Sequence, residues 1–88
     1  MNSADKKKLR ADAHSLKPVV MIGQSGLTAG VLAELDQALN THELLKVKIR
    51  AESDDRKLIN AQLCAETGAE LIQSIGQIAV LYRLNPNK

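Results

Sequence analysis

The chain has 88 residues, which fits one domain with a modest core, and no linker or repeat divides it. Its formal net charge is only +2, and Tyr82 is its one aromatic residue, which argues against RNA-binding modules that stack bases on aromatic side chains. Its one cysteine, Cys64, excludes an internal disulfide and fits a reducing, cytoplasmic compartment, and no apolar run approaches the ~18 residues of a membrane-spanning helix.

The first predicted element is a helix that begins with Ser3 as its cap and ends near His14 or Ser15, before Pro18. One of its faces is apolar and predicted to be buried, with Leu9, Ala13 and Leu16. A second face forms a basic stripe of Lys6, Arg10, His14 and Lys17. Basic residues therefore gather near this end of the chain.

A strand is predicted at residues 19–22, and its unbroken apolar run is typical of a strand covered on both faces or central in a sheet. The next helix is capped by Thr28 and ends near Asn40 or Thr41. Its apolar face contains Val31, Leu32, Leu35, Ala38 and Leu39. Its polar side carries Glu34 and Asp36 and no basic residue.

Residues 44–50 alternate between apolar and basic side chains, which predicts a half-buried strand with a basic outer face. The inward residues are Leu45, Val47 and Ile49. The outward residues are Lys46, Lys48 and Arg50.

The last part of the chain predicts a helix and a hairpin. Residues 53–55 offer caps for a helix that runs to about Thr67 and stops at Gly68. Its inward side is predicted to contain Leu58, Ile59, Leu63 and Ala65. Two strands, at residues 71–75 and 78–83, are separated by the two-residue turn Gly76-Gln77.

The predicted order is helix, strand, helix, strand, helix, strand, strand, which is an α/β fold. The two strand–helix–strand crossovers place the first three strands parallel, and the hairpin makes the last one antiparallel. We expect a two-layer α-β-α-β-α-β-β domain spanning residues 1–88, with the helices mainly on one side of a mixed four-stranded sheet. Residues 1–3 and 85–88 are expected to be frayed.

The tetrad Gly23-Gln24-Ser25-Gly26 lies between the first strand and the second helix. A glycine loop that opens a helix offers bare backbone N–H groups and the positive end of the helix dipole. The basic residues before it make a nucleic-acid backbone a credible ligand. Taken alone, the pattern also suits an ordinary turn at a helix start.

Other reactive side chains point to no catalytic or metal site. His14 and His42 lie at predicted helix ends, where histidine suits the dipole, and Cys64 is expected to pack as a small apolar residue. No Cys–His–carboxylate cluster has ligand spacing, so we expect no metal and no cofactor. Arg83 is open to two interpretations, an RNA contact or an ion pair within the fold.

Four segments in order match a known pattern. They are Leu9-Arg10-x-x-Ala13-His14-x-Leu16-Lys17-Pro18, Ile22-Gly23-Gln24-x-Gly26-Leu27-Thr28, His42-Glu43-Leu44-x-Lys46-Val47-Lys48, and Ile75-Gly76-x-x-x-Val80-Leu81-Tyr82-Arg83. Together they resemble the CRM domain (chloroplast RNA splicing and ribosome maturation), in its bacterial single-domain YhbY-like form, over about residues 4–84.

The resemblance implies a fold related to the C-terminal domain of translation initiation factor three, and RNA binding with the glycine loop used as in KH domains. It also implies a non-enzymatic factor associated with precursors of the large ribosomal subunit. We expect a monomer with no small-molecule substrate and no membrane partner. The residues expected to contact RNA are Gly23, Gln24, Ser25, Gly26, Thr28, Arg10, His14, Lys17, Lys46, Lys48 and Arg50.

Two other functions stay open at this point. A structural adaptor would bind a ribosomal protein through the acidic helix that carries Glu34 and Asp36. A nucleotide-binding enzyme would use the glycine loop for phosphate, but the loop does not end in Lys-Ser or Lys-Thr and no acid–base pair accompanies it.

Overall fold

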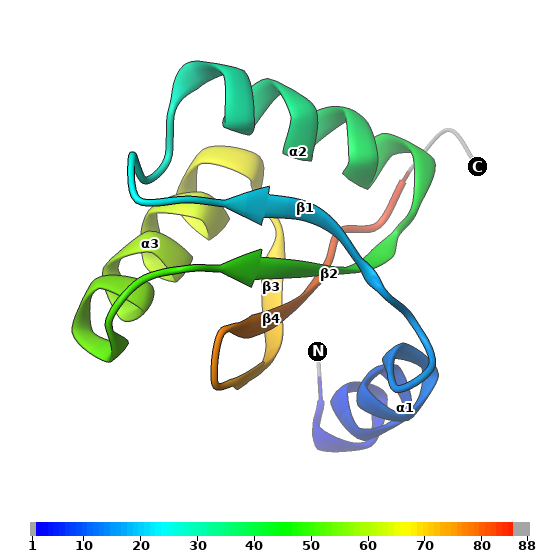
Figure 1. Ribbon diagram of the computed structural model, residues 1–88. Helices are drawn as coiled ribbons and strands as arrows, with labels where there is room; N and C mark the ends of the chain where they lie inside the picture. The colour runs from blue at the N-terminus through cyan, green and yellow to red at the C-terminus, as the bar shows by residue number, and fades with distance from the viewer. Residues whose placement is uncertain (1, 86–88) are drawn as a thin grey trace.

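The structure, a computed structural model, describes residues 2–85 and contains the elements in the predicted order (Figure 1). They are α1 (Ser3–Ala13), β1 (Pro18–Ile22), α2 (Ala29–Thr41), β2 (Leu44–Ile49), α3 (Ser53–Thr67), β3 (Glu70–Ile75) and β4 (Ile78–Tyr82). The α/β class is therefore confirmed.

The strands form one mixed four-stranded sheet in the spatial order β1-β2-β4-β3. β1 and β2 are parallel, and β4 is antiparallel to both of its neighbours, β2 and β3. The first three strands therefore share one direction, as predicted from the crossovers. The turn at Gly76-Gln77 joins β3 to β4 and leaves Ile75 opposite Ile78.

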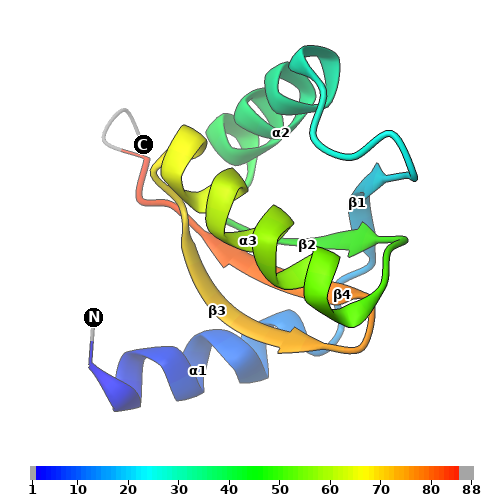
Figure 2. The ribbon, with the colours of Figure 1, turned by 90° about the vertical axis from the view of Figure 1, so that its left-hand side faces the viewer.

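Two helices cover one face of the sheet, and α1 lies against the other face (Figure 2). The main core lies between the sheet, α2 and α3, where Val47, Leu35 and Leu63 are fully buried. On the opposite face a smaller cluster joins Ala13 of α1 to Val80 of β4. α1 thus adds a partial third layer to the expected two and leaves part of this face open.

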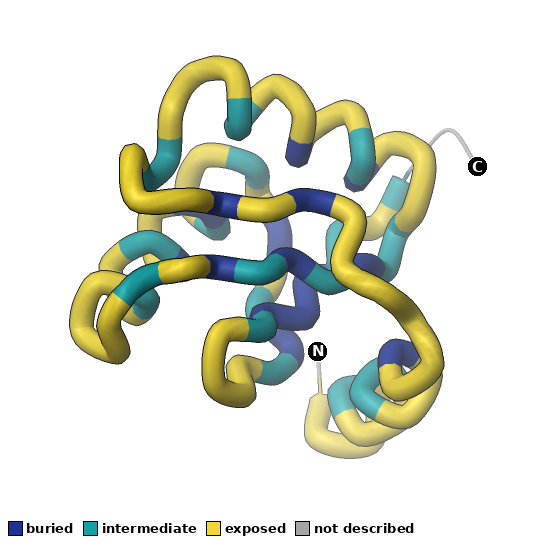
Figure 3. The backbone as a smooth tube through the Cα atoms, in the orientation of Figure 1, coloured by how far each residue is buried: buried dark blue, intermediate teal, exposed yellow. Residues whose placement is uncertain are grey.

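The prediction that β1 is covered on both faces or central in the sheet is wrong. Val20 and Ile22 are buried in the main core, but Val19 and Met21 are 48% and 53% exposed (Figure 3). β1 is an edge strand, and α1 packs against β2 and β3 instead. An apolar run in the sequence predicts a strand with apolar side chains on both faces. How many of those faces are covered depends on the packing of distant elements.

The predicted inward face of α3 is right for Ile59 and Leu63 and wrong for Leu58 and Ala65. Leu58 is 70% exposed, because it precedes Leu63 by five residues and therefore lies about 140° away around the helix. Asn60 takes a buried position on this face instead.

The start of α1 differs by one residue from the prediction. Asn2 rather than Ser3 is the cap, since its Oδ1 accepts the N–H of Asp5 at 2.8 Å. The helix ends at Ala13, so Leu16 lies beyond it and is 37% exposed rather than buried.

The two ends of α3 are formed differently. No side chain caps its start: Ser53 is the first helical residue, and Asp54 and Asp55 lie in the first turn rather than at the cap. Gly68 ends the helix as predicted, with a φ of +75° that favours glycine.

Near both ends of the described chain, residues take part in the fold. Ser3 begins α1. Asn85 donates its backbone N–H to a carboxylate oxygen of Glu43 at 2.8 Å and its side-chain amide to the carbonyl of Asn40 at 2.6 Å. The expected fraying of residues 1 and 86–88 lies outside the described residues.

Candidate nucleic-acid interface

Three connections meet at the end of the sheet where β1 and β2 finish: residues 23–28, residues 50–52 and the β3–β4 turn (Figures 1 and 2). Two backbone hydrogen bonds tie them together. Arg50 donates its N–H to the carbonyl of Ile22 at 2.9 Å, and Ile49 donates to the carbonyl of Gln77 at 2.7 Å. Segments far apart in the sequence therefore form one end of the molecule.

The glycine tetrad forms a tight turn that precedes α2. Gly26 donates its N–H to the carbonyl of Gly23 at 3.0 Å, and its φ of +73° lies in the left-handed region. α2 begins only at Ala29, because Thr28 is its cap and accepts the N–H of Val31 at 3.2 Å. The cap is confirmed, but the tetrad stands before the helix rather than opening it.

The middle of this turn is open to solvent. Gln24 and Ser25 are exposed, and within residues 2–85 their backbone N–H groups donate to no protein acceptor. A Cβ atom added at Gly23 would meet no other atom within 4 Å. No acidic residue lies in the first turn of α2, so an anion can approach both the turn and the helix start.

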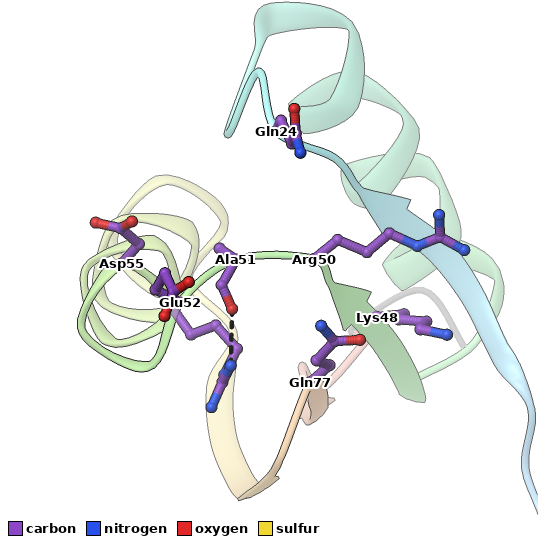
Figure 4. Close-up of a pocket in the computed structure, with 8 residues that line it drawn as sticks. Gln24, Lys48, Arg50, Ala51, Glu52, Asp55 and Gln77 are labelled. Carbon is purple, nitrogen blue, oxygen red and sulfur yellow. Dashed lines mark hydrogen bonds between the residues drawn. The ribbon is translucent and has the colours of Figure 1, made fainter.

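Beside the turn lies a hollow of about 730 Å³, which we call the loop hollow (Figure 4). Gln24, Lys48, Arg50 and Gln77 line it on the side of the sheet and the turns. Lys48 is half-buried and Arg50 is exposed. This wall offers two cations and two amides to a polyanion.

The opposite wall of the loop hollow belongs to the start of α3 and is acidic. Glu52 and Asp55 lie there, and Arg56 is held in place by a hydrogen bond from its Nη1 to the carbonyl of Ala51 at 2.7 Å (Figure 4). The carboxylates occupy the positive end of this helix dipole. A phosphate backbone is therefore favoured on the sheet side and repelled from α3.

A second group of predicted site residues gathers where α1 meets the sheet. Arg10, His14 and Lys46 line a smaller hollow there. The Nζ of Lys46 lies 3.5 Å from the carbonyl of His14, at the edge of hydrogen-bond distance. Lys17 is exposed in the connection between α1 and β1 and lines neither hollow, and Thr28 serves chiefly as the α2 cap.

Arg83 has a structural role. Its Nη1 donates to a carboxylate oxygen of Asp36 at 2.7 Å and to the carbonyl of Thr67 at 2.8 Å. Its Nη2 donates to the carbonyl of Asp36 at 3.0 Å and to the side chain of Asn40 at 2.8 Å. The ion pair left open by the sequence is therefore the correct interpretation.

Cys64 is half-buried and packs against the main core. Burial, and then the negative charge of Glu70, raise the pKa of its thiol, so it stays protonated at neutral pH. Within residues 2–85 no three histidine, cysteine or carboxylate side chains gather to hold a metal ion. The helices of this described part are all too short or too polar to cross a membrane.

Sequence reasoning missed Arg56 and Gln77 in the loop hollow and Gln73 beside α1. In the sequence, Gln77 is recognisable only as a turn residue. Its place in the loop hollow follows from the pairing of β4 with β2. Gln73 lies on the α1 side because a register shift between Leu71 and Gln73 interrupts the alternation of β3, and no local sequence signal marks this shift.

A family model, the CRS1 / YhbY (CRM) domain, matches residues 1–83. The chain belongs to this family. The match includes the glycine turn, β2 and all of the residues expected to contact RNA.

Several relatives of this CRM domain carry RNA binding in their names. A probable RNA-binding protein of Pseudomonas aeruginosa is 49% identical over 98% of this chain and 84% of its own length. An RNA-binding protein of Haemophilus influenzae is 49% identical over 94% of this chain and 85% of its own length. A solved structure of a candidate RNA-binding protein of Staphylococcus aureus has a TM-score of 0.85, with 33% identity over 96% of this chain and 88% of that one.

Proposed function

We propose that this CRM domain binds structured RNA through the glycine turn and the basic side of the loop hollow. The observation that carries the proposal is the exposed middle of the glycine turn, where Gln24 and Ser25 have free N–H groups and Gln24 lines the same hollow as Lys48 and Arg50. Backbone amides and cations together match phosphate oxygens, which receive most hydrogen bonds in protein–nucleic acid contacts. Family membership and the names of the relatives support RNA as the ligand.

The path of the RNA follows β2. Lys46 and Lys48 lie two residues apart on the same face of this strand, about 7 Å from each other along it. They connect the glycine turn to Arg10 of α1 and to His14, which directly follows this helix. Glu52 and Asp55 flank the path and keep the phosphates on the sheet side.

The physiological ligand in this proposal is ribosomal RNA in precursors of the large subunit, bound by a monomer that assists assembly and performs no catalysis. The unpaired Cys64 suits a reducing cytoplasm, where such precursors would be met. The adaptor alternative is weakened, because Asp36 pairs with Arg83 and leaves Glu34 as the remaining carboxylate of α2. No observation favours the nucleotide-binding enzyme.

The direct test replaces Gln24 and Ser25 with aspartate. Both side chains are exposed, so the fold should tolerate the change, while each carboxylate repels an incoming phosphate. We expect RNA affinity to fall by about five- to a hundredfold at low salt, measured by titration of fluorescent RNA.

The matched control is Gln62→Asp with Ala65→Asp. It makes the same change in net charge on the exposed second half of α3, away from the glycine turn. It should weaken binding much less. Equal affinities of the turn variant and wild type, with both folded, would show that RNA does not contact the turn.

A further inference from the structure

The hollow between α1 and the sheet has features that phosphate binding does not explain. It has a volume of about 220 Å³ and is separate from the loop hollow. We call it the α1 hollow. It is smaller than the ~300–1,000 Å³ pockets that take drug-sized ligands, so it suits one ring system rather than a larger molecule.

The floor of the α1 hollow is apolar and built from neighbouring strands. Val80 and Ile78 of β4 lie two residues apart and point to the same face, and Ile75 of β3 lies opposite Ile78. Ile75 is 63% exposed although it is a large apolar residue. Adjacent aliphatic side chains on a pleated sheet form a low surface that can support the face of a flat ring.

One wall of the hollow carries an amide. Gln73 lies opposite Val80 on the β3 side, just as Lys46 lies opposite Val80 on the β2 side. Gln73 is half-buried, and its side chain has no hydrogen-bond partner within residues 2–85. A glutamine amide presents one donor next to one acceptor, the arrangement that pairs with the N6 and N7 edge of adenine.

The rim of the hollow carries two cations, Arg10 of α1 and Lys46 of β2, together with His14, which follows α1 as its C-terminal cap. A planar guanidinium stacks on aromatic rings, and an ammonium attracts the phosphate that accompanies a base. Lys46 also connects the α1 hollow to Lys48 in the loop hollow, along one face of β2.

We propose that the α1 hollow receives one unstacked nucleobase of the bound RNA, with adenine favoured through Gln73. This inference rests on the proposed RNA binding and adds a base contact to it. The RNA is then unpaired at one position, and that position is read by side chains without an aromatic platform.

The test compares single-stranded oligo-A, oligo-U and a fully abasic oligonucleotide of the same length, each bound to the full chain. We expect wild type to bind oligo-A at least about fivefold more tightly than the other two, as one bidentate contact provides. Gln73→Ala should bind oligo-A and oligo-U alike, with the salt dependence of wild type. The control Gln62→Ala, on the exposed side of α3, should keep the preference.

A second measurement needs no variant. In NMR spectra of wild type, oligo-A should shift the methyl signals of Ile75, Ile78 and Val80 through the ring current of the base, and the abasic oligonucleotide should not. Equal binding of the three RNAs by wild type, or unshifted methyl signals, would overturn the base site alone. Absence of salt-dependent binding to every RNA would overturn the proposed function as well.

Discussion

At the scale of single residues, the two glycines of the turn have different constraints. Gly26 has a φ of +73°, which residues other than glycine rarely adopt, so the fold itself requires glycine there. Gly23 has no such φ, and space is open around it. The fold would accept a larger residue at Gly23, so a requirement for glycine there would come from the ligand.

This difference predicts opposite outcomes for two alanine variants. Gly26→Ala should lower the free energy of unfolding by about 1–2 kcal/mol, because an L-residue is strained in the left-handed backbone conformation. Gly23→Ala should change it by less than about 1 kcal/mol and yet weaken RNA binding about fivefold, the value of one hydrogen bond to a phosphate. Urea denaturation and RNA titration measure the two effects. A folded Gly23→Ala variant with wild-type affinity would contradict close approach of RNA to this glycine.

At the scale of elements, the start of α3 and the end of β2 form two walls of opposite charge. Glu52 and Asp55 stabilise the start of α3 through its dipole, and they also line the loop hollow together with Lys48 and Arg50. The same carboxylates that favour the fold therefore oppose the ligand.

Removing these charges should strengthen RNA binding and weaken the fold. Glu52→Gln with Asp55→Asn should raise RNA affinity about two- to fivefold at low salt and lower the free energy of unfolding by up to about 1 kcal/mol. The control Glu34→Gln with Glu66→Gln makes the same change in net charge elsewhere. An equal gain in the control would mean that net charge alone matters, and not the acidic wall.

Arg83 joins three elements through one guanidinium. It follows β4, and its partners are Asp36 and Asn40 of α2 and Thr67 at the end of α3. Its side chain is 19% exposed, so solvent screens these bonds less than it screens surface pairs.

Arg83→Ala should lower the free energy of unfolding by about 2–3 kcal/mol, because several charge-assisted hydrogen bonds are lost together. Arg83→Lys should recover only part of this, since an ammonium cannot reproduce the planar fork. Arg50→Ala, at an exposed site, should cost less than about 1 kcal/mol in a thermal or urea melt. Similar losses for Arg83→Ala and Arg50→Ala would contradict a structural role for Arg83.

At the scale of the whole molecule, the sequence predicted what depends on local patterns. The alternation of β2, the Thr28 cap, the Gly68 stop and the Gly76-Gln77 turn are all found in the structure. The sequence did not predict features that depend on packing between distant elements. For example, α1 does not cover β1, so Met21 is exposed on this edge strand. The same is true of the candidate site. Sequence motifs predicted the glycine turn and the lysines of β2, but only the tertiary structure shows that they lie near one another.

The central claim is that the basic side of this molecule binds the RNA backbone, and the salt dependence of binding tests it most directly. If about three to five phosphates are neutralised, the logarithm of the affinity for single-stranded RNA should fall against the logarithm of salt with a slope of about −2 to −4. Lys46→Ala with Lys48→Ala should make that slope shallower by about one to one and a half. A slope near zero for the wild-type protein, or the same slope for the double variant, would contradict the account.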